Sequence, residues 1–135
     1  MNQKILNETL IEIVINNSNN FYNKIREEYL FVCNSRTILS TYIQINNKNH
    51  LIYGYQSPQN TMTRTIEFLN ILTKTVNSSA KFRFRLNELE TSLYYLKRDN
   101  PQITLKIIKI QEDYEIQLYD NNNELDTTLS CELII

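Results

Sequence analysis

The length and composition of this chain predict one domain with a hydrophobic core. It has 135 residues, a formal net charge of −1 and 41% hydrophobic residues, which suits a globular domain that folds without structural disulfides or metals. Gly54 is the only glycine, which excludes the Gly-rich phosphate-binding loops, and no apolar run reaches the roughly 20 residues of a membrane helix.

Two helices are predicted at the start of the chain. Within residues 3–15, apolar side chains recur at helical spacing. They are Ile5, Leu6, Leu10, Ile13 and Val14. Asparagine and serine at 16–20 should end this helix, and Asn19 or Asn20 is expected to cap a second one. The stripe of the second helix consists of Phe21, Ile25, Tyr29 and Val32. One continuous kinked helix is the alternative.

Residues 37–45 and 51–56 are predicted to form a β-hairpin. A two-residue turn at 47–48 would set its register. The resulting pairs are Ile43 with Ile52 and Tyr42 with Tyr53. In this register Tyr42, Tyr53 and Tyr55 share one face, where they either form a binding surface or cover a second core.

A long amphipathic helix is predicted over residues 62–76, followed by a strand. The helix stripe consists of Met62, Ile66, Leu69, Leu72 and Val76. Lys81–Leu86 then alternates cation and apolar residue without a break, which is typical of a strand because successive side chains point to opposite faces. One face would carry Lys81, Arg83 and Arg85, and the other Phe82, Phe84 and Leu86.

The remaining residues are predicted to hold one helix and three strands. Asn87 and Glu90 have the spacing of a capping box for a helix over 87–98. Strands at 103–110 and 114–119 should flank a tight turn at Glu112-Asp113. Their expected pairs are Ile107 with Leu118 and Lys109 with Ile116. A last strand at 127–135 has Leu129, Cys131, Leu133 and Ile135 on one side.

Together these elements predict an α+β fold, with N-terminal helices plus a mostly antiparallel sheet with helices packed on one face. Residues 1–135 are expected to form a single domain. The order of two helices, a hairpin and a third helix resembles the cone-shaped folds of the nuclear-transport-factor-like group, from which the helix at 87–98 departs. The resemblance leaves open a small-molecule pocket or an enzyme on a cone-like fold.

Charge is distributed unevenly along the chain. Residues 61–110 contain nine basic and four acidic side chains, a net of +5, whereas residues 111–135 contain seven acidic side chains and no basic one. The simplest interpretation is that the basic strand lies beside an acidic strand and that the two pair across the sheet. Exposed pairs of this kind contribute only about 0–1 kcal/mol each.

The charges also supply candidate partner-binding residues. The cations could hold phosphate, nucleic acid or an acidic protein, and they are Lys81, Arg83, Arg85, Lys97 and Arg98. The acidic residues could meet a basic partner, and they are Glu112, Asp113, Glu115, Asp120, Glu124 and Asp126. The near-neutral net charge argues against a dedicated DNA-binding protein.

No catalytic constellation stands out in the sequence. His50 is the only histidine and lies beside a predicted turn, and Cys33 and Cys131 are too remote for a C-x-x-C pair. We therefore expect no catalytic residue, no cofactor and no metal site, and we expect Cys131 to be a buried core thiol.

The function predicted from these observations is that of a non-enzymatic protein-binding module in the cytoplasm, without membrane contact. Its most concrete form is an inhibitor or immunity-type protein of a low-GC bacterium, phage or mobile element. A protein is the expected partner, and a homodimer is an alternative. Nucleic-acid binding through the Lys81/Arg83/Arg85 strand is the second hypothesis, and the pocket or enzyme on a cone-like fold is the third.

Overall fold

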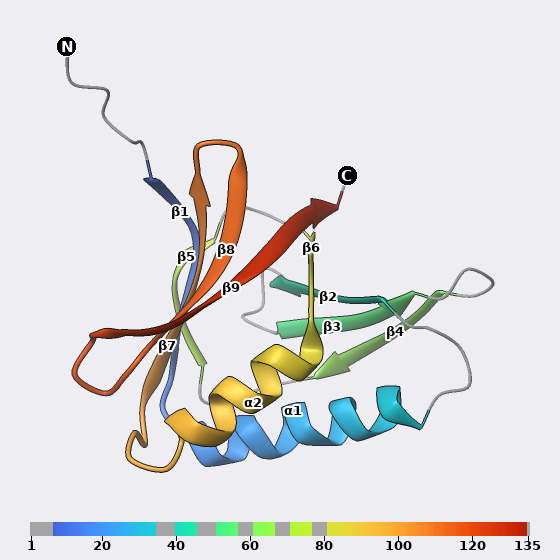
Figure 1. The fold of residues 1–135 in the computed structure, drawn as a ribbon, viewed down its shortest axis with the longest axis horizontal. Helices are drawn as coiled ribbons and strands as arrows, with labels where there is room; N and C mark the ends of the chain where they lie inside the picture. The colour runs from blue at the N-terminus through green and yellow to red at the C-terminus, as the bar shows by residue number, and fades with distance from the viewer. Residues whose placement is uncertain are drawn as a thin grey trace.

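The computed structural model describes residues 7–34, 40–45, 51–56, 61–66, 71–76 and 81–134, with side chains at 7–34 and 82–133. Within these residues, strands and helices follow one another along the chain (Figure 1). The elements are β1 (Asn7–Ile15), α1 (Ser18–Cys33), β2 (Ser40–Ile45), β3 (Leu51–Gln56), β4 (Thr61–Ile66), β5 (Ile71–Val76), β6 (Lys81–Phe84), α2 (Leu86–Leu96), β7 (Ile103–Ile110), β8 (Asp113–Tyr119) and β9 (Leu125–Ile134).

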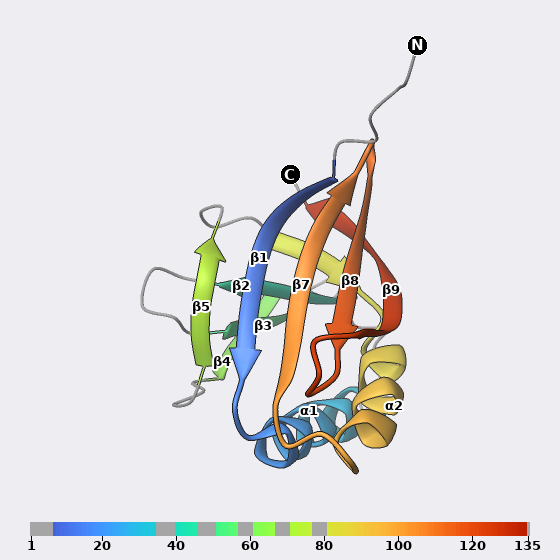
Figure 2. The same cartoon turned by 90° about the vertical axis from the view of Figure 1, so that its left-hand side faces the viewer.

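The strands form one antiparallel sheet in the order β4-β3-β2-β6-β9-β8-β7-β1-β5. Laid flat, eight strand spacings of about 4.8 Å would make this sheet about 38 Å wide. Its two edges, β4 and β5, are consecutive in the chain, and the five Cα–Cα steps between them span at most about 19 Å. The sheet therefore has to curl, and in Figures 1 and 2 β2, β3 and β4 run across the direction of β1 and β7.

One hydrophobic core joins the sheet to both helices. Phe21 and Ile25 of α1, Leu89 and Leu93 of α2, and Phe82 of β6 are almost completely buried in it. The two helices lie together across one end of the sheet, at the bottom of Figures 1 and 2. The predicted α+β class and antiparallel sheet are confirmed, and the prediction of a single domain fits one sheet with one core.

The predicted helix at 3–15 is wrong, because residues 7–15 form β1. Consecutive residues of this strand are buried, since Leu10, Ile11, Ile13 and Val14 are all at most 8% exposed, and its register with β7 is irregular between Thr9 and Ile11. A strand buried on both faces loses the alternation that normally identifies strands. The alternative of one continuous kinked helix is wrong for the same reason.

The predicted helix over 62–76 is also wrong, because its residues fall largely in β4 and β5. Threonine occupies every second position from Thr61 to Thr65, and β-branched residues favour strands. With strands at 7–15, 61–66 and 71–76, the helix order that resembled the cone-shaped folds is not present. The resemblance therefore gives no support to the third hypothesis, the pocket or enzyme on a cone-like fold.

The structure contains the predicted second helix and the predicted hairpin, but the helix cap and the strand register differ from the prediction. Helix α1 is confirmed, but its N-cap is Asn17, whose side chain accepts a hydrogen bond from the Asn20 backbone N–H at 3.0 Å. Strands β2 and β3 pair as predicted, but Tyr42 lies opposite Gly54 instead of Tyr53. Because a one-residue shift exchanges faces, the predicted Tyr42–Tyr53 pairing is wrong. The side chains of these tyrosines lie outside the described ones.

The C-terminal hairpin has the predicted faces but not the predicted register. Ile107 pairs with Ile116 instead of Leu118, and the connection lies at residues 111–112, where Gln111 has a φ of 57°. A displacement of two residues keeps every side chain on its face, so Leu105, Ile107 and Ile116 are buried as expected.

The segment from 81 to 98 follows the prediction closely. Phe82 and Phe84 are buried, while Arg83 and Arg85 are exposed, so the alternation of β6 is confirmed. The strand ends at Phe84, however, and Leu86 already belongs to α2. The N-cap of α2 is Arg85, which makes no side-chain capping hydrogen bond, and the predicted capping role of Asn87 is wrong.

Candidate functional site

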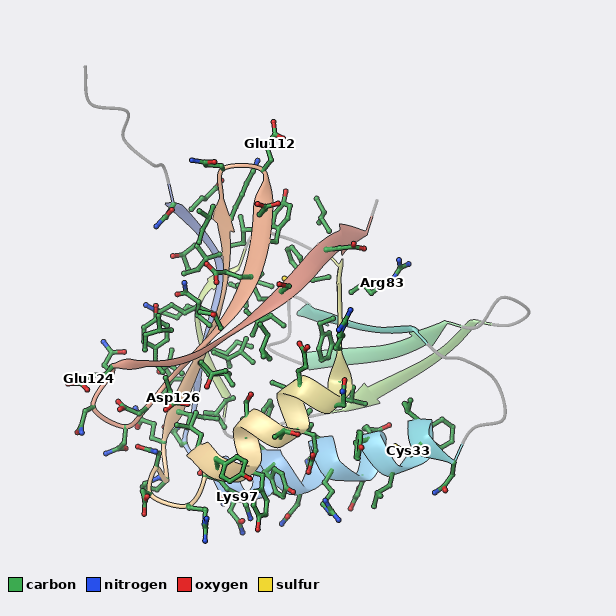
Figure 3. All side chains as sticks on the ribbon, in the orientation of Figure 1. Cys33, Arg83, Lys97, Glu112, Glu124 and Asp126 are labelled. Carbon is green, nitrogen blue, oxygen red and sulfur yellow. The ribbon has the colours of Figure 1, made fainter. Side chains whose placement is uncertain are left out.

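The predicted cations separate into two groups at opposite ends of α2. Arg83 and Arg85 precede the helix, and Lys97 and Arg98 follow it. Eleven helical residues span about 16 Å at 1.5 Å per residue, and Figure 3 shows Arg83 and Lys97 far apart. Lys81 begins β6, but its side chain is not among the described ones. The described cations therefore do not form one continuous row.

Arg83 and Arg85 each lie near a carboxylate. The register of β6 and β9 places Arg83 opposite Glu132, and Arg83 Nη1 is 3.8 Å from Glu132 Oε2. Arg85 Nη1 is 3.8 Å from Glu88 Oε1, three residues along the chain. The Arg83 and Glu132 side chains are 47% and 78% exposed, so water screens this pair. The basic strand thus lies beside the acidic C-terminal strand, as the simplest interpretation of the charges predicted.

The acidic candidates do not gather in one patch. Glu112 lies in the turn between β7 and β8, and Glu124 lies at the opposite end of that hairpin, before β9 (Figure 3). Asp113 and Glu115 belong to β8, and Asp126 belongs to β9 near Glu124. These side chains are distributed over both ends of the sheet, which does not favour a single acidic docking surface.

Asp120 has a structural role in the loop between β8 and β9. Its Oδ1 accepts hydrogen bonds from the backbone N–H groups of Asn122 and Glu124, both at 2.9 Å. Its own N–H donates to the Glu124 carbonyl at 2.9 Å. Aspartate often stabilises turns in this way, so these contacts account for Asp120 without a partner.

The cations after α2 belong to a cluster that the sequence analysis did not identify. We call it the tyrosine–cation cluster, and it consists of Tyr22, Arg26, Glu90, Tyr94, Tyr95, Lys97 and Arg98. Its inner part joins the two helices. The Tyr22 hydroxyl donates to Glu90 Oε1 at 2.7 Å, and Arg26 Nη1 is 3.2 Å from the same oxygen. Burial of Tyr22, together with its hydrogen bond to Glu90, raises the pKa of the Tyr22 hydroxyl, which therefore stays a neutral donor.

The outer part of the cluster presents aromatic rings and cations to solvent. Tyr94 and Tyr95 are 44% and 64% exposed, and their rings meet edge to face with centroids 5.3 Å apart. Lys97 Nζ lies 4.4 Å from the centre of the Tyr22 ring and bonds Asn19 Oδ1 at 3.2 Å. Arg98 lies over the Tyr94 ring.

Lys97 and Arg98 differ from the arginines before the helix in one respect. Among the residues that the structure describes, no carboxylate lies within 4.0 Å of either cation. Within the described part of the chain, no direct ion pair therefore compensates their positive charges. Tyr94 and Tyr95 could have been noticed in the sequence, because they lie between Leu93 and Leu96 of the apolar stripe as two consecutive aromatic residues.

A cavity of about 770 Å³ lies at the other end of α2. Its walls come from the last turns of α1, from β6, from the first turn of α2 and from β9. Both cysteines line it. Cys33 is exposed and Cys131 is buried, and both are free thiols. Burial, with the nearby Glu115 carboxylate, raises the pKa of the Cys131 thiol to about 12, so the prediction of a buried core thiol is confirmed.

Among the described residues, no group of three or more His, Cys, Asp or Glu side chains is placed to hold a metal ion. Neither α1 nor α2 is long and apolar enough to cross a membrane. His50 lies outside the described residues.

No protein-family model matches this chain, and no match was found among curated proteins or among solved structures.

Proposed function

We propose that this protein is a non-enzymatic protein-binding module and that it binds its partner through the tyrosine–cation cluster. The observation that carries the proposal is the pair of exposed rings at Tyr94 and Tyr95 beside Lys97 and Arg98, two cations without a carboxylate partner among the described residues. Tyrosine and arginine dominate the energetic centres of protein interfaces, because they combine a large contact area with polar tips.

The inner contacts of the cluster support this proposal by fixing the exposed rings. Tyr22 and Tyr94 contact each other with ring centroids 5.9 Å apart, and Tyr22 is held by its hydrogen bond to the buried Glu90. A side chain that is already ordered loses little conformational entropy when a partner binds. The network between the helices thus favours a preorganised contact surface.

The charge of the cluster indicates the chemistry of the partner. Lys97 and Arg98 would attract an acidic segment, and complementary charge raises the association rate and the specificity. A small inhibitor or immunity-type protein that covers an acidic surface of its target is the specific form that we propose. Nucleic acid is the alternative ligand of the same cations, and the experiment below distinguishes the two.

The proposal is tested by capture from a lysate of the native host with four immobilised proteins: the wild type, Tyr95→Ala, Arg98→Gln and Arg85→Gln. Arg85→Gln is the matched control, since it removes an exposed arginine from the opposite end of α2. We expect at least one host protein to be retained by the wild type and by Arg85→Gln and to be lost from both cluster variants. The purified partner should then bind Arg98→Gln about tenfold more weakly, with a stronger effect at low salt.

Two results would contradict the proposal. One is a catalytic turnover of the purified protein that disappears when a single side chain is changed. The other is retention of every captured protein by the cluster variants at the wild-type level. Binding of RNA or DNA that weakens steeply with salt and is lost in Arg98→Gln would instead support the nucleic-acid alternative.

A further inference from the structure

The cavity before α2 has the composition of a small-molecule site. Its volume of about 770 Å³ lies in the range of about 300–1,000 Å³ that is usual for ligand pockets. Val32, Phe84 and Leu86 supply apolar surface from three different elements. Arg83 and Arg85 contribute to the same walls. Such a cavity can accept an apolar body and an anionic group at the same time.

The two guanidinium groups are available to a ligand even though carboxylates lie near them. Each arginine is linked to its carboxylate through one nitrogen at 3.8 Å, whereas a guanidinium carries five N–H donors. Exposed pairs of this geometry are weak, because water screens the two charges. A ligand carboxylate can form a bidentate contact with a guanidinium, which is the stronger arrangement.

We propose that this cavity binds a small amphiphilic carboxylate, whose head group contacts Arg83 and Arg85 and whose aliphatic body packs on Val32, Phe84 and Leu86. The site is independent of the tyrosine–cation cluster, because the length of α2 separates them. An inorganic anion would leave the apolar walls in contact with water, and a neutral lipid would leave each guanidinium group with only its long, exposed contact to Glu132 or Glu88. An amphiphilic carboxylate contacts both the apolar walls and the guanidinium groups.

Cys33 provides a direct measure of occupancy, because it is exposed and lines the cavity. At neutral pH iodoacetamide should alkylate Cys33 and spare the buried Cys131, whose pKa is raised to about 12. The rate of Cys33 alkylation is measured with octanoate as the probe. At about three times the octanoate Kd, the rate should fall about fourfold, since only the empty protein reacts.

Matched probes and variants separate the two halves of the proposal. Acetate has the charge without the body, octan-1-ol has the body without the charge, and neither should protect Cys33 at the octanoate concentration. Protection by octanoate should be lost in the double variant Arg83→Gln/Arg85→Gln and kept in Arg98→Gln. Glu132→Gln removes a competing carboxylate, so octanoate should bind it about threefold more tightly, in line with the small energy of an exposed pair.

Three outcomes would overturn the inference. The first is an alkylation rate of the wild type that octanoate does not change. The second is equal protection by octan-1-ol, which would show a site without a charge requirement. The third is unchanged octanoate binding in Glu132→Gln together with full protection in the double arginine variant. Circular dichroism of each variant verifies that it is folded.

Discussion

The two ends of α2 carry the same kinds of side chain in different surroundings. At the start, Arg83 and Arg85 each lie 3.8 Å from a carboxylate beside a cavity. At the end, Lys97 and Arg98 lie against tyrosine rings, with no carboxylate partner among the described residues. The comparison teaches that the number of charges does not define a binding surface. A binding surface is defined by the residues that strand register and helix packing place next to each charge.

The carboxylates at the two ends differ as well. Glu90 is buried and accepts hydrogen bonds from Tyr22 and Arg26, whereas Glu132 is exposed and lies 3.8 Å from Arg83. A buried carboxylate that loses its partners is costly, while an exposed one is stabilised by water. The end with the tyrosines should therefore be the more rigid of the two.

The largest expected effect concerns β6, the strand that leads into the first end of α2. Phe82→Ala should lower the free energy of unfolding by about 3–5 kcal/mol, because Phe82 is fully buried. Arg83→Ala, one residue along, should change it by no more than about 0.5 kcal/mol. Urea unfolding followed by circular dichroism measures both. Similar losses for the two variants would contradict the assignment of the faces.

The second prediction concerns the buried carboxylate. Glu90→Ala should destabilise the protein by about 2 kcal/mol, because the buried Tyr22 hydroxyl loses its acceptor, while the half-exposed Arg26 can turn to water. Glu90→Gln keeps an acceptor oxygen and should cost about half as much. Urea unfolding measures both variants. Equal losses in the free energy of unfolding would show that side-chain packing, and not the hydrogen bond, holds the two helices together.

The third prediction uses the buried thiol of the cavity. The folded protein keeps Cys131 protonated to about pH 12, whereas the unfolded chain ionises this thiol above its ordinary pKa. The unfolded state therefore loses a proton first, and stability falls as pH rises. Between about pH 8 and about pH 10 the wild type should lose about 1.5 kcal/mol more than Cys131→Val. A Cys33→Ser control keeps Cys131 and should retain this pH dependence. Parallel curves for the wild type and Cys131→Val would contradict the prediction.

The smallest effect decides how available Arg83 is. A double-mutant cycle with Arg83→Gln and Glu132→Gln should give a coupling energy below about 0.5 kcal/mol. The corresponding cycle for Arg26 and Glu90 should give about 1–2 kcal/mol, because that carboxylate is buried. A coupling energy above about 2 kcal/mol would mean that the ion pair with Glu132 holds Arg83 in place. This result would weaken the ligand proposal for the cavity.

Local patterns predicted those elements of the fold that expose one face to water. Strand β6, with Phe82 inside and Arg83 outside, and the hairpin of β7 and β8 were identified from their alternation. Strand β1 was mistaken for a helix because Leu10 and Ile11 are both buried, which removes the alternation. Strand register was the least predictable quantity, since it depends on turn geometry, and neither hairpin connection contains the Asn-Gly or Asp-Gly pair that would specify the turn.

The candidate sites were predicted in part. Lys97 and Arg98 were named from their charge, but the rings of Tyr22, Tyr94 and Tyr95 that surround them were not. The contact of Tyr22 with Glu90 joins residues that are 68 positions apart. Such a contact has no local signature, because it arises only when two helices pack.

By itself, the sequence determined the α+β class, the two faces of β6, the buried Cys131 and the absence of a Gly-rich phosphate loop. These properties depend on residue type and on spacings of two to four positions, which short-range sterics and burial control. Only the tertiary structure decided that Arg83 faces Glu132, that the cavity contains both cysteines, and that Lys97 lies on the Tyr22 ring. Those contacts depend on strand order and helix packing, which are set by the burial of the whole core and not by any single segment.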